Sequence, residues 1–111
     1  MKVIVVGRDS SGKSTFVNEV KRTAGNIETL ELNRIEDLIS RYTPNDKIVF
    51  IQTPLILCLK RANRVFINME DLKKQDEYLS YVTELPDCTI IKNDRSFDDF
   101  KVKIKKYVKS F

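Results

Sequence analysis

Residues 7–14 read Gly-Arg-Asp-Ser-Ser-Gly-Lys-Ser and match the pattern G-x-x-x-x-G-K-[ST] at all of its defined positions. Glycine at both ends of such a loop lets the backbone turn tightly and bring its N–H groups against phosphate oxygens. Lys13 supplies a cation for the β- and γ-phosphates, and the Ser14 hydroxyl can ligate Mg²⁺. The sequence therefore predicts a nucleoside triphosphate site formed by Gly7, Arg8, Asp9, Ser10, Ser11, Gly12, Lys13, Ser14 and Thr15.

The flanking segments place this loop between a strand and a helix. Residues 2–6 (Lys-Val-Ile-Val-Val) form a short apolar, β-branched run that ends at Gly7, as a buried parallel strand should. The residues after the loop predict a helix over 13–23, whose positive dipole end would face the same anion. Its apolar residues recur at helical spacing: Phe16, Val17, Val20 and Ala24.

The rest of the chain continues to alternate between strand and helix patterns. Residues 27–32 alternate apolar and polar side chains, which predicts an edge strand and makes a homodimer through that edge an expectation. Residues 47–52 and 88–91 read as two further strands. Helices are expected around 35–42, from Pro54 onward, from Asn68 to Val82, and from Ser96 to the C-terminus. This alternation predicts a three-layer α/β/α sandwich with a four-stranded parallel sheet in the order 2-1-3-4, the P-loop NTPase fold.

Two of these helices carry an apolar stripe on one face, and the stripe of the C-terminal helix is expected to be core packing. In the helix around 35–42 the stripe consists of Ile35, Leu38, Ile39 and Tyr42. In the C-terminal helix it consists of Phe97, Phe100, Ile104, Tyr107, Val108 and Phe111.

Composition narrows the classes of function. At 111 residues, with 41% hydrophobic and 32% charged residues, the sequence fits a single globular domain over 1–111. No apolar run approaches a membrane span or a signal-peptide core, so a cytoplasmic location is expected. The chain has no histidine, and Cys58 and Cys88 lie among apolar neighbours, which favours buried free thiols over a disulfide or a zinc site. Catalysis would rely on lysine, arginine, carboxylates and Mg²⁺.

Positive charge gathers near the C-terminus of a chain whose net charge is +4. Because the same segment carries an apolar stripe, a solvated helix face is favoured over a surface for nucleic acid. The lysines concerned are Lys101, Lys103, Lys105, Lys106 and Lys109.

Residues 7–15 (Gly-Arg-Asp-Ser-Ser-Gly-Lys-Ser-Thr) resemble the P-loop of thymidylate kinases and related nucleoside and deoxynucleoside monophosphate kinases, which often reads G-x-D-x-x-G-K-S-T. Residues 57–64 (Leu-Cys-Leu-Lys-Arg-Ala-Asn-Arg) are similar to the segment that leads into the arginine-bearing lid of these kinases. Residues 90–94 (Ile-Ile-Lys-Asn-Asp) resemble their adenine-side loop. The resemblance implies ATP and Mg²⁺ as cofactors, and a nucleotide or nucleoside that accepts the phosphoryl group.

The resemblance also implies roles for single residues. Lys13 and the backbone of residues 8–14 would hold the ATP phosphates, Ser14 would ligate Mg²⁺, and Asp9 would lie close to the sugar of the acceptor. Taken by itself, Asp9 also fits a turn residue without a ligand.

Four residues outside the loop receive roles in the same way. Arg61 and Arg64 would neutralise the transferring phosphoryl group, and Asn93 and Asp94 would line the adenine pocket. Guanidinium groups match phosphate oxygens in geometry. The two arginines fit equally well as solvated residues at a helix C-terminus, where the helix dipole favours them.

The sequence departs from these kinases in two respects. They usually carry an acidic residue at the end of a strand beside the P-loop strand, where this chain has Asn33. Glu31 points to the same face of that strand and could substitute for it, whereas Gln52 and Thr53 end the other buried strand without a carboxylate. The helical insertion that covers the acceptor in these kinases is also missing.

Three functions therefore stay open at the level of sequence. The favoured one is an ATP- and Mg²⁺-dependent kinase for a nucleotide or nucleoside. The second is a non-catalytic, NTP-binding regulatory or interaction protein that reuses a kinase-like core. The third is a kinase for nucleic-acid ends, suggested by the lysine-rich C-terminal helix, which would show salt-sensitive binding to DNA or RNA.

Overall fold

The computed structural model describes residues 2–8, 10–32, 35–62, 70, 73, 77 and 80–110. Its four strands are β1 (Lys2–Gly7), β2 (Glu28–Leu32), β3 (Lys47–Gln52) and β4 (Cys88–Lys92). They form one parallel sheet in the order β2-β1-β3-β4, which confirms the predicted topology. β1 and β3 are central and read as continuous apolar runs because both of their faces are buried. β2, the predicted edge strand, lies at one edge, and β4 lies at the other.

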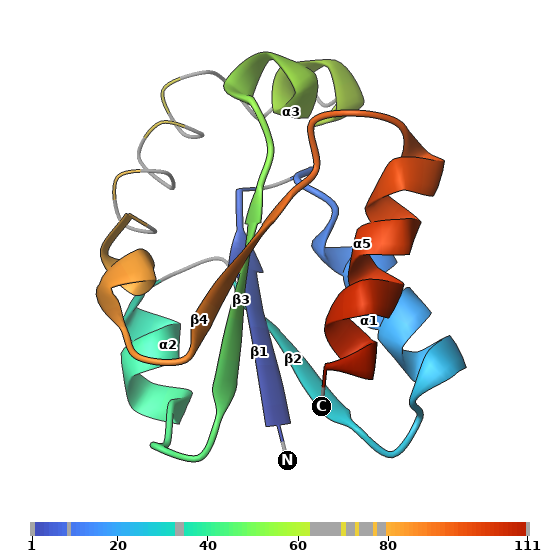
Figure 1. Ribbon diagram of the computed structural model, residues 1–111. Helices are drawn as coiled ribbons and strands as arrows, with labels where there is room; N and C mark the ends of the chain where they lie inside the picture. Colours follow the sequence, from blue (N-terminus) through green and yellow to red (C-terminus); the bar gives the residue numbers. More distant parts are fainter. Residues whose placement is uncertain are drawn as a thin grey trace.

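Helices cover both faces of the sheet (Figure 1). Helices α1 (Lys13–Thr23) and α5 (Phe97–Lys109) pack together on one face, and α2 (Ile35–Arg41) lies on the other with the 3₁₀ helix η1 (Ser80–Glu84). Helix α3 (Leu55–Ala62) lies beyond the end of the sheet where β3 ends. Right-handed crossovers of this kind are what parallel strands require.

Alternate residues of the strands feed two separate hydrophobic cores, because successive side chains point to opposite faces. On the α1/α5 face the core contains Val3, Val5, Phe16, Val20, Val49, Ile51, Ile91, Phe100 and Ile104. On the other face it contains Ile4, Val6, Leu32, Leu38, Ile48, Phe50 and Val82. Both cores rest on β1 and β3, so the loop that follows β1 is anchored to the most rigid part of the sheet.

One residue of each predicted apolar stripe is exposed. The Ile39 side chain is 74% exposed, because the seven-residue α2 presents Leu38 to the sheet and turns the next residue outward. Phe97 is 58% exposed at the first turn of α5, where the Lys101 ammonium lies 4.6 Å from its ring centroid. The deeper positions of both helices, Leu38, Phe100 and Ile104, are buried as expected.

Several local predictions are confirmed. The Ser96 hydroxyl caps α5 by accepting a hydrogen bond from the Asp99 N–H at 3.0 Å. Cys58 is buried, Cys88 is half-buried, both thiols are free, and burial raises the pKa of each. The helix expected from Asn68 to Val82 falls largely outside the described residues, and its last part is the 3₁₀ helix η1. None of the helices in the described part of the chain combines the length and apolar character needed to cross a bilayer.

Candidate phosphate-binding site

The loop between β1 and α1 leaves the sheet at Gly7 and enters the helix at Gly12. Gly12 is the N-cap of α1 and has a φ of 114°, a left-handed conformation that favours glycine. Ser10 also has a positive φ, 64°, and the Ser11 N–H donates to the Arg8 carbonyl at 3.1 Å. Asp9 lies outside the described residues. The predicted loop thus starts and ends at the expected positions.

Close packing explains why both ends of the loop are glycine. A Cβ on Gly12 would lie 2.6 Å from Asn93 Nδ2 and 2.9 Å from Phe100 Cε2. A Cβ on Gly7 would lie 2.6 Å from Ser11 Oγ and 3.0 Å from a backbone oxygen of β3. Any side chain at either position would therefore push the loop away from the sheet or from α5.

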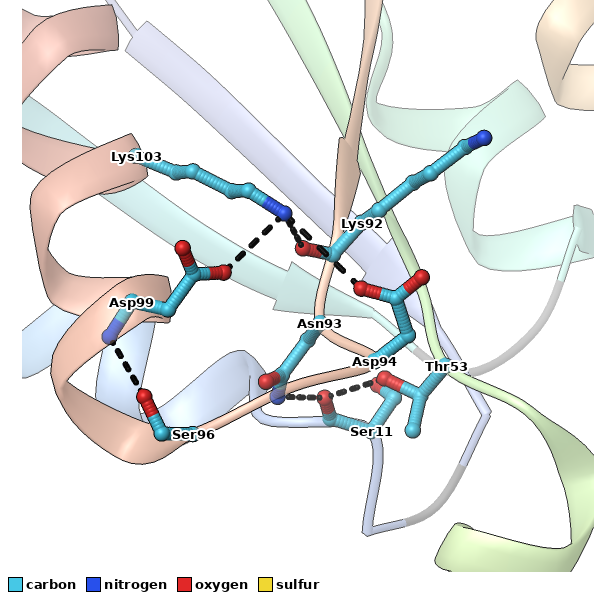
Figure 2. A network of polar contacts seen from close by, with 8 residues as sticks. All are labelled: Ser11, Thr53, Lys92, Asn93, Asp94, Ser96, Asp99 and Lys103. Atoms are coloured by element: carbon cyan, nitrogen blue, oxygen red, sulfur yellow. Dashed lines mark hydrogen bonds and ion pairs between the residues drawn. The ribbon is translucent and has the colours of Figure 1, made fainter.

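Two buried side chains converge on the Ser11 carbonyl from either side (Figure 2). The Thr53 hydroxyl, just after β3, donates to it at 2.8 Å, and the Asn93 amide, just after β4, donates at 2.7 Å. Both residues are only 4% exposed. Because a trans peptide directs its C=O and N–H to opposite sides, these donors turn the Gly12 N–H away from the sheet. The Thr53–Ser11–Asn93 contact, which we call the carbonyl clamp, thus aims a backbone donor toward the side of the loop where an anion would bind.

The Lys13 side chain curls back into the loop. Its ammonium donates to the Gly7 carbonyl at 3.0 Å and to the Arg8 carbonyl at 2.7 Å, and the residue is 5% exposed. A cation held there by backbone oxygens lies beside the loop N–H groups, so the site concentrates positive potential at the start of α1.

Ser14, in the first turn of α1, meets a carboxylate from the neighbouring strand. Its hydroxyl donates to Glu31 Oε1 at 3.2 Å. Glu31 is opposite Val5 in the β1–β2 register, near the carboxyl end of the edge strand, and both polar side chains are exposed. The structure thus brings together the predicted metal ligand and the carboxylate considered as a substitute. Asn33 lies outside the described residues.

A pocket of about 310 Å³ lies beside the loop at the carboxyl ends of β3 and β4. The Arg8 guanidinium crosses it and donates to the Thr53 carbonyl at 3.1 Å. Asp94 lines this pocket, whereas the Asn93 amide is turned under the loop to Ser11. The lining residues are Arg8, Phe50, Gln52, Thr53, Pro54, Lys92 and Asp94.

A second polar cluster fixes the segment that follows β4 (Figure 2). Lys103 of α5 donates to the Lys92 carbonyl at 2.9 Å and forms ion pairs with Asp99 at 3.2 Å and with Asp94 at 3.8 Å. These contacts tie the end of β4 to α5. They therefore support Asn93 in the carbonyl clamp.

The remaining residues with expected roles are more dispersed. Arg61 lies in the last turn of α3 with an exposed side chain, and Thr15 is half-buried in the first turn of α1. Arg64 lies outside the described residues. The sequence did not lead us to predict that Thr53 contacts the loop. A hydroxyl residue directly after a buried strand and before a proline could have indicated such a contact.

A scan of the chain against protein-family models matches no family, and a search of curated proteins matches no relative. The site is therefore interpreted from its own geometry. Within the described residues, no cluster of three or more histidine, cysteine or acidic side chains could hold a metal ion by itself.

Proposed function

We propose that the protein binds ATP with Mg²⁺ at the loop of residues 7–14 and transfers the terminal phosphoryl group to a nucleotide or nucleoside. The observation that carries this proposal is the 3.2 Å contact between Ser14 and Glu31. It puts a carboxylate next to the hydroxyl that the loop pattern assigns to the metal. A site for phosphate binding alone has no need of a negative charge at this point.

The loop supports the binding half of the proposal. The carbonyl clamp directs the Gly12 N–H outward, and Lys13 lies inside the loop within reach of the phosphates. Phosphates bind at helix N-termini because unpaired N–H groups and the helix dipole both favour an anion. Two positive φ values in the loop are consistent with a backbone shaped around a ligand.

The residues present fit Mg²⁺ in the manner usual for nucleotide sites. Mg²⁺ keeps several waters and binds through one or two protein oxygens together with phosphate oxygens. Ser14 would be a direct ligand, and Glu31 would hold the ion or one of its waters. When bound, the ion supplies neutralisation of the charge on the phosphates.

Phosphoryl transfer, the second part of the proposal, breaks one bond and forms another. The bond between the γ-phosphorus and the bridging oxygen of ADP breaks, and a bond to an oxygen of the acceptor forms. Such transfer depends on positioning and charge neutralisation rather than on covalent chemistry by the protein. The lid-like arginines Arg61 and Arg64 would neutralise the moving group. The pocket lined by Asp94 and Thr53 is large enough for a nucleobase, and the resemblance to thymidylate kinases favours a nucleotide as acceptor.

A coupled assay of ADP release over a panel of nucleosides and nucleoside monophosphates tests the proposal. We expect Glu31→Gln to lower turnover about 10- to 100-fold, the usual cost of losing a group that orients a metal site. Glu28→Gln is the matched control, because Glu28 is an exposed glutamate on the same strand, three residues earlier and away from Ser14. Measurable ATP binding without turnover on any acceptor would contradict the transfer step.

That outcome would favour a non-catalytic, NTP-binding protein. The observation on its side is that β3, the other neighbour of β1, ends in Gln52 and Thr53, and Thr53 is occupied by the carbonyl clamp. This alternative expects Lys13→Ala to abolish nucleotide binding and association with a partner together, with no phosphoryl transfer by the parent protein.

A further inference from the structure

Among the described strands, β4 forms an edge of the sheet and pairs with β3 alone. Backbone groups alternate in direction along a parallel strand. The Asp87 carbonyl and the Asn93 N–H both bond to β3, which orients the residues between them. Thr89 and Ile91 therefore face β3, and the backbone groups of Cys88, Ile90 and Lys92 face outward.

The outward groups lie on an accessible surface. The Ile90 side chain is 48% exposed in the middle of the strand. The Lys92 carbonyl accepts a hydrogen bond from Lys103, which leaves the upstream part of the edge for another donor or acceptor. In Figure 1 no helix or strand of the described chain crosses in front of β4. The geometry offers backbone pairing over Cys88 and Ile90 together with the Lys92 N–H.

A groove of about 570 Å³ runs beside this edge, between β4 and α5. Thr89 and Ile91 form one side of it and the Tyr107 ring forms the other. Burial raises the pKa of Tyr107 to about 12, as expected for a ring in apolar surroundings. Side chains of a strand added to the edge would alternate between this groove and the opposite face.

Lysines set the charge of the groove. Lys106 is exposed at its rim, whereas the Lys92 side chain leaves β4 on the face away from α5 (Figure 2), and no carboxylate occurs among the described lining residues of the groove. Lys103, the other lysine that lines the groove, is already paired with Asp94 and Asp99, so among the described residues the positive charge available at the groove is that of Lys106.

We propose that the β4 edge and its groove bind an extended, acidic segment of a partner protein as a fifth strand, with carboxylates of that segment on the groove face at Lys106. Strand addition supplies affinity through main-chain hydrogen bonds and specificity through alternate side chains. A second copy fits less well, because symmetric pairing of two β4 edges would place like charges opposite each other. This inference does not depend on the proposed kinase activity.

The test uses the full chain and a fluorescent peptide of about eight residues with alternating valine and glutamate, a length suited to one strand. We expect saturable binding by fluorescence anisotropy and no binding of the matching valine–lysine peptide. Hydrogen exchange should slow at the Ile90 and Lys92 amides and stay unchanged at the Thr89 and Ile91 amides, which are already bonded to β3. Electrostatic adsorption of the peptide alone would not produce this alternation.

Two variants sharpen the test. Ile90→Pro removes an outward N–H without breaking a bond to β3, and proline is tolerated at sheet edges in that orientation. We expect it to weaken peptide binding at least about tenfold. Lys106→Glu, which keeps the backbone intact, should weaken peptide binding about fivefold. Lys105→Glu is the matched control, because Lys105 is exposed on the same helix and is not among the residues lining the groove.

Three results would overturn the proposal. One is equal binding of the acidic and basic peptides, which would show that the lysines do not select the partner. Another is equal loss of binding in the Lys105 and Lys106 variants. The last is self-association by sedimentation that Ile90→Pro abolishes, which would make a second copy the occupant of the edge.

Discussion

Replacing Thr53 by valine and Asn93 by alanine, singly and together, should show how much the carbonyl clamp contributes to the loop of residues 7–14. The two donors reach the Ser11 carbonyl at 2.8 and 2.7 Å, and both side chains are buried. A carbonyl oxygen has two lone pairs, so one donor still satisfies it when the other is lost. The single variants therefore test a lost hydrogen bond, and the double variant tests an unsatisfied buried oxygen.

The expected losses of unfolding free energy differ between the single and the double variants. Losing one hydrogen bond costs about 0.5–1.5 kcal/mol of unfolding free energy. Asn93→Ala loses in addition the contacts of its side chain with Gly12. In the double variant the buried Ser11 oxygen has lost both clamp donors, which adds about 1–3 kcal/mol. We expect the double variant to be destabilised by more than the sum of the singles, a coupling that a double-mutant cycle measures directly.

The assay separates stability from loop geometry. Urea denaturation gives the unfolding free energies, calorimetry gives ATP affinity for the folded variants, and the ¹⁵N–¹H resonance of Gly12 reports the orientation of its amide. We expect the double variant to bind ATP about tenfold more weakly and to shift the Gly12 resonance without nucleotide. Thr53→Ser is the control, because it keeps the hydroxyl donor. Unchanged ATP affinity and an unchanged Gly12 resonance in a destabilised double variant would refute a positioning role for the clamp.

Three further predictions concern single residues. Gly12→Ala should lower the unfolding free energy by about 2–4 kcal/mol, because its Cβ would lie 2.6 Å from Asn93 at a φ of 114°. The control is Gly25→Ala, whose Cβ would lie 3.2 Å from the nearest atom. It should lower the unfolding free energy far less in the same urea titration. Burial raises the pKa of Tyr107 to about 12, so the stability it contributes is present below pH 10 and lost as pH rises toward 12; Tyr107→Phe should flatten that part of a stability-against-pH curve. Lys13→Met should change the melting temperature without nucleotide only slightly and remove the upward shift caused by ATP, because the variant trades a buried ammonium for an apolar chain of similar length.

The sequence was sufficient to predict the sheet because its signals are local and strong. The runs at 2–6 and 47–52 are buried on both faces and could only be central parallel strands, and residues 27–32 show the alternation of an edge. The start of α1 at Lys13 followed from the loop pattern itself. Each of these conclusions depends on neighbouring residues alone.

The sequence did not predict the side-chain positions that depend on packing between elements far apart in the chain. Ile39 and Phe97 have helical spacing but lie beyond the area that the sheet can cover, so periodicity alone placed them inside. Nothing in the local sequence indicated that the Asn93 amide donates to the Ser11 carbonyl, a contact that depends on the close approach of β4 to the loop. The Asn93–Ser11 contact joins residues 82 positions apart. The sequence around either residue does not indicate it, because each residue also fits an ordinary local role.

The loop combines features that a protein selected for stability alone would avoid. It holds a buried ammonium, a non-glycine residue with a φ of 64° and a fully buried Ser11 whose hydroxyl has no hydrogen-bond partner among the described residues. Each of these costs folding free energy, and the carbonyl clamp and the central strands compensate for them. Local strain supported by a rigid surrounding structure is characteristic of ligand sites, because the free energy spent in shaping the backbone is recovered when an anion meets donors already aimed at it. The same reasoning applies to Glu31, a carboxylate beside this positive site, whose charge would oppose a bound phosphate unless a cation stood between them.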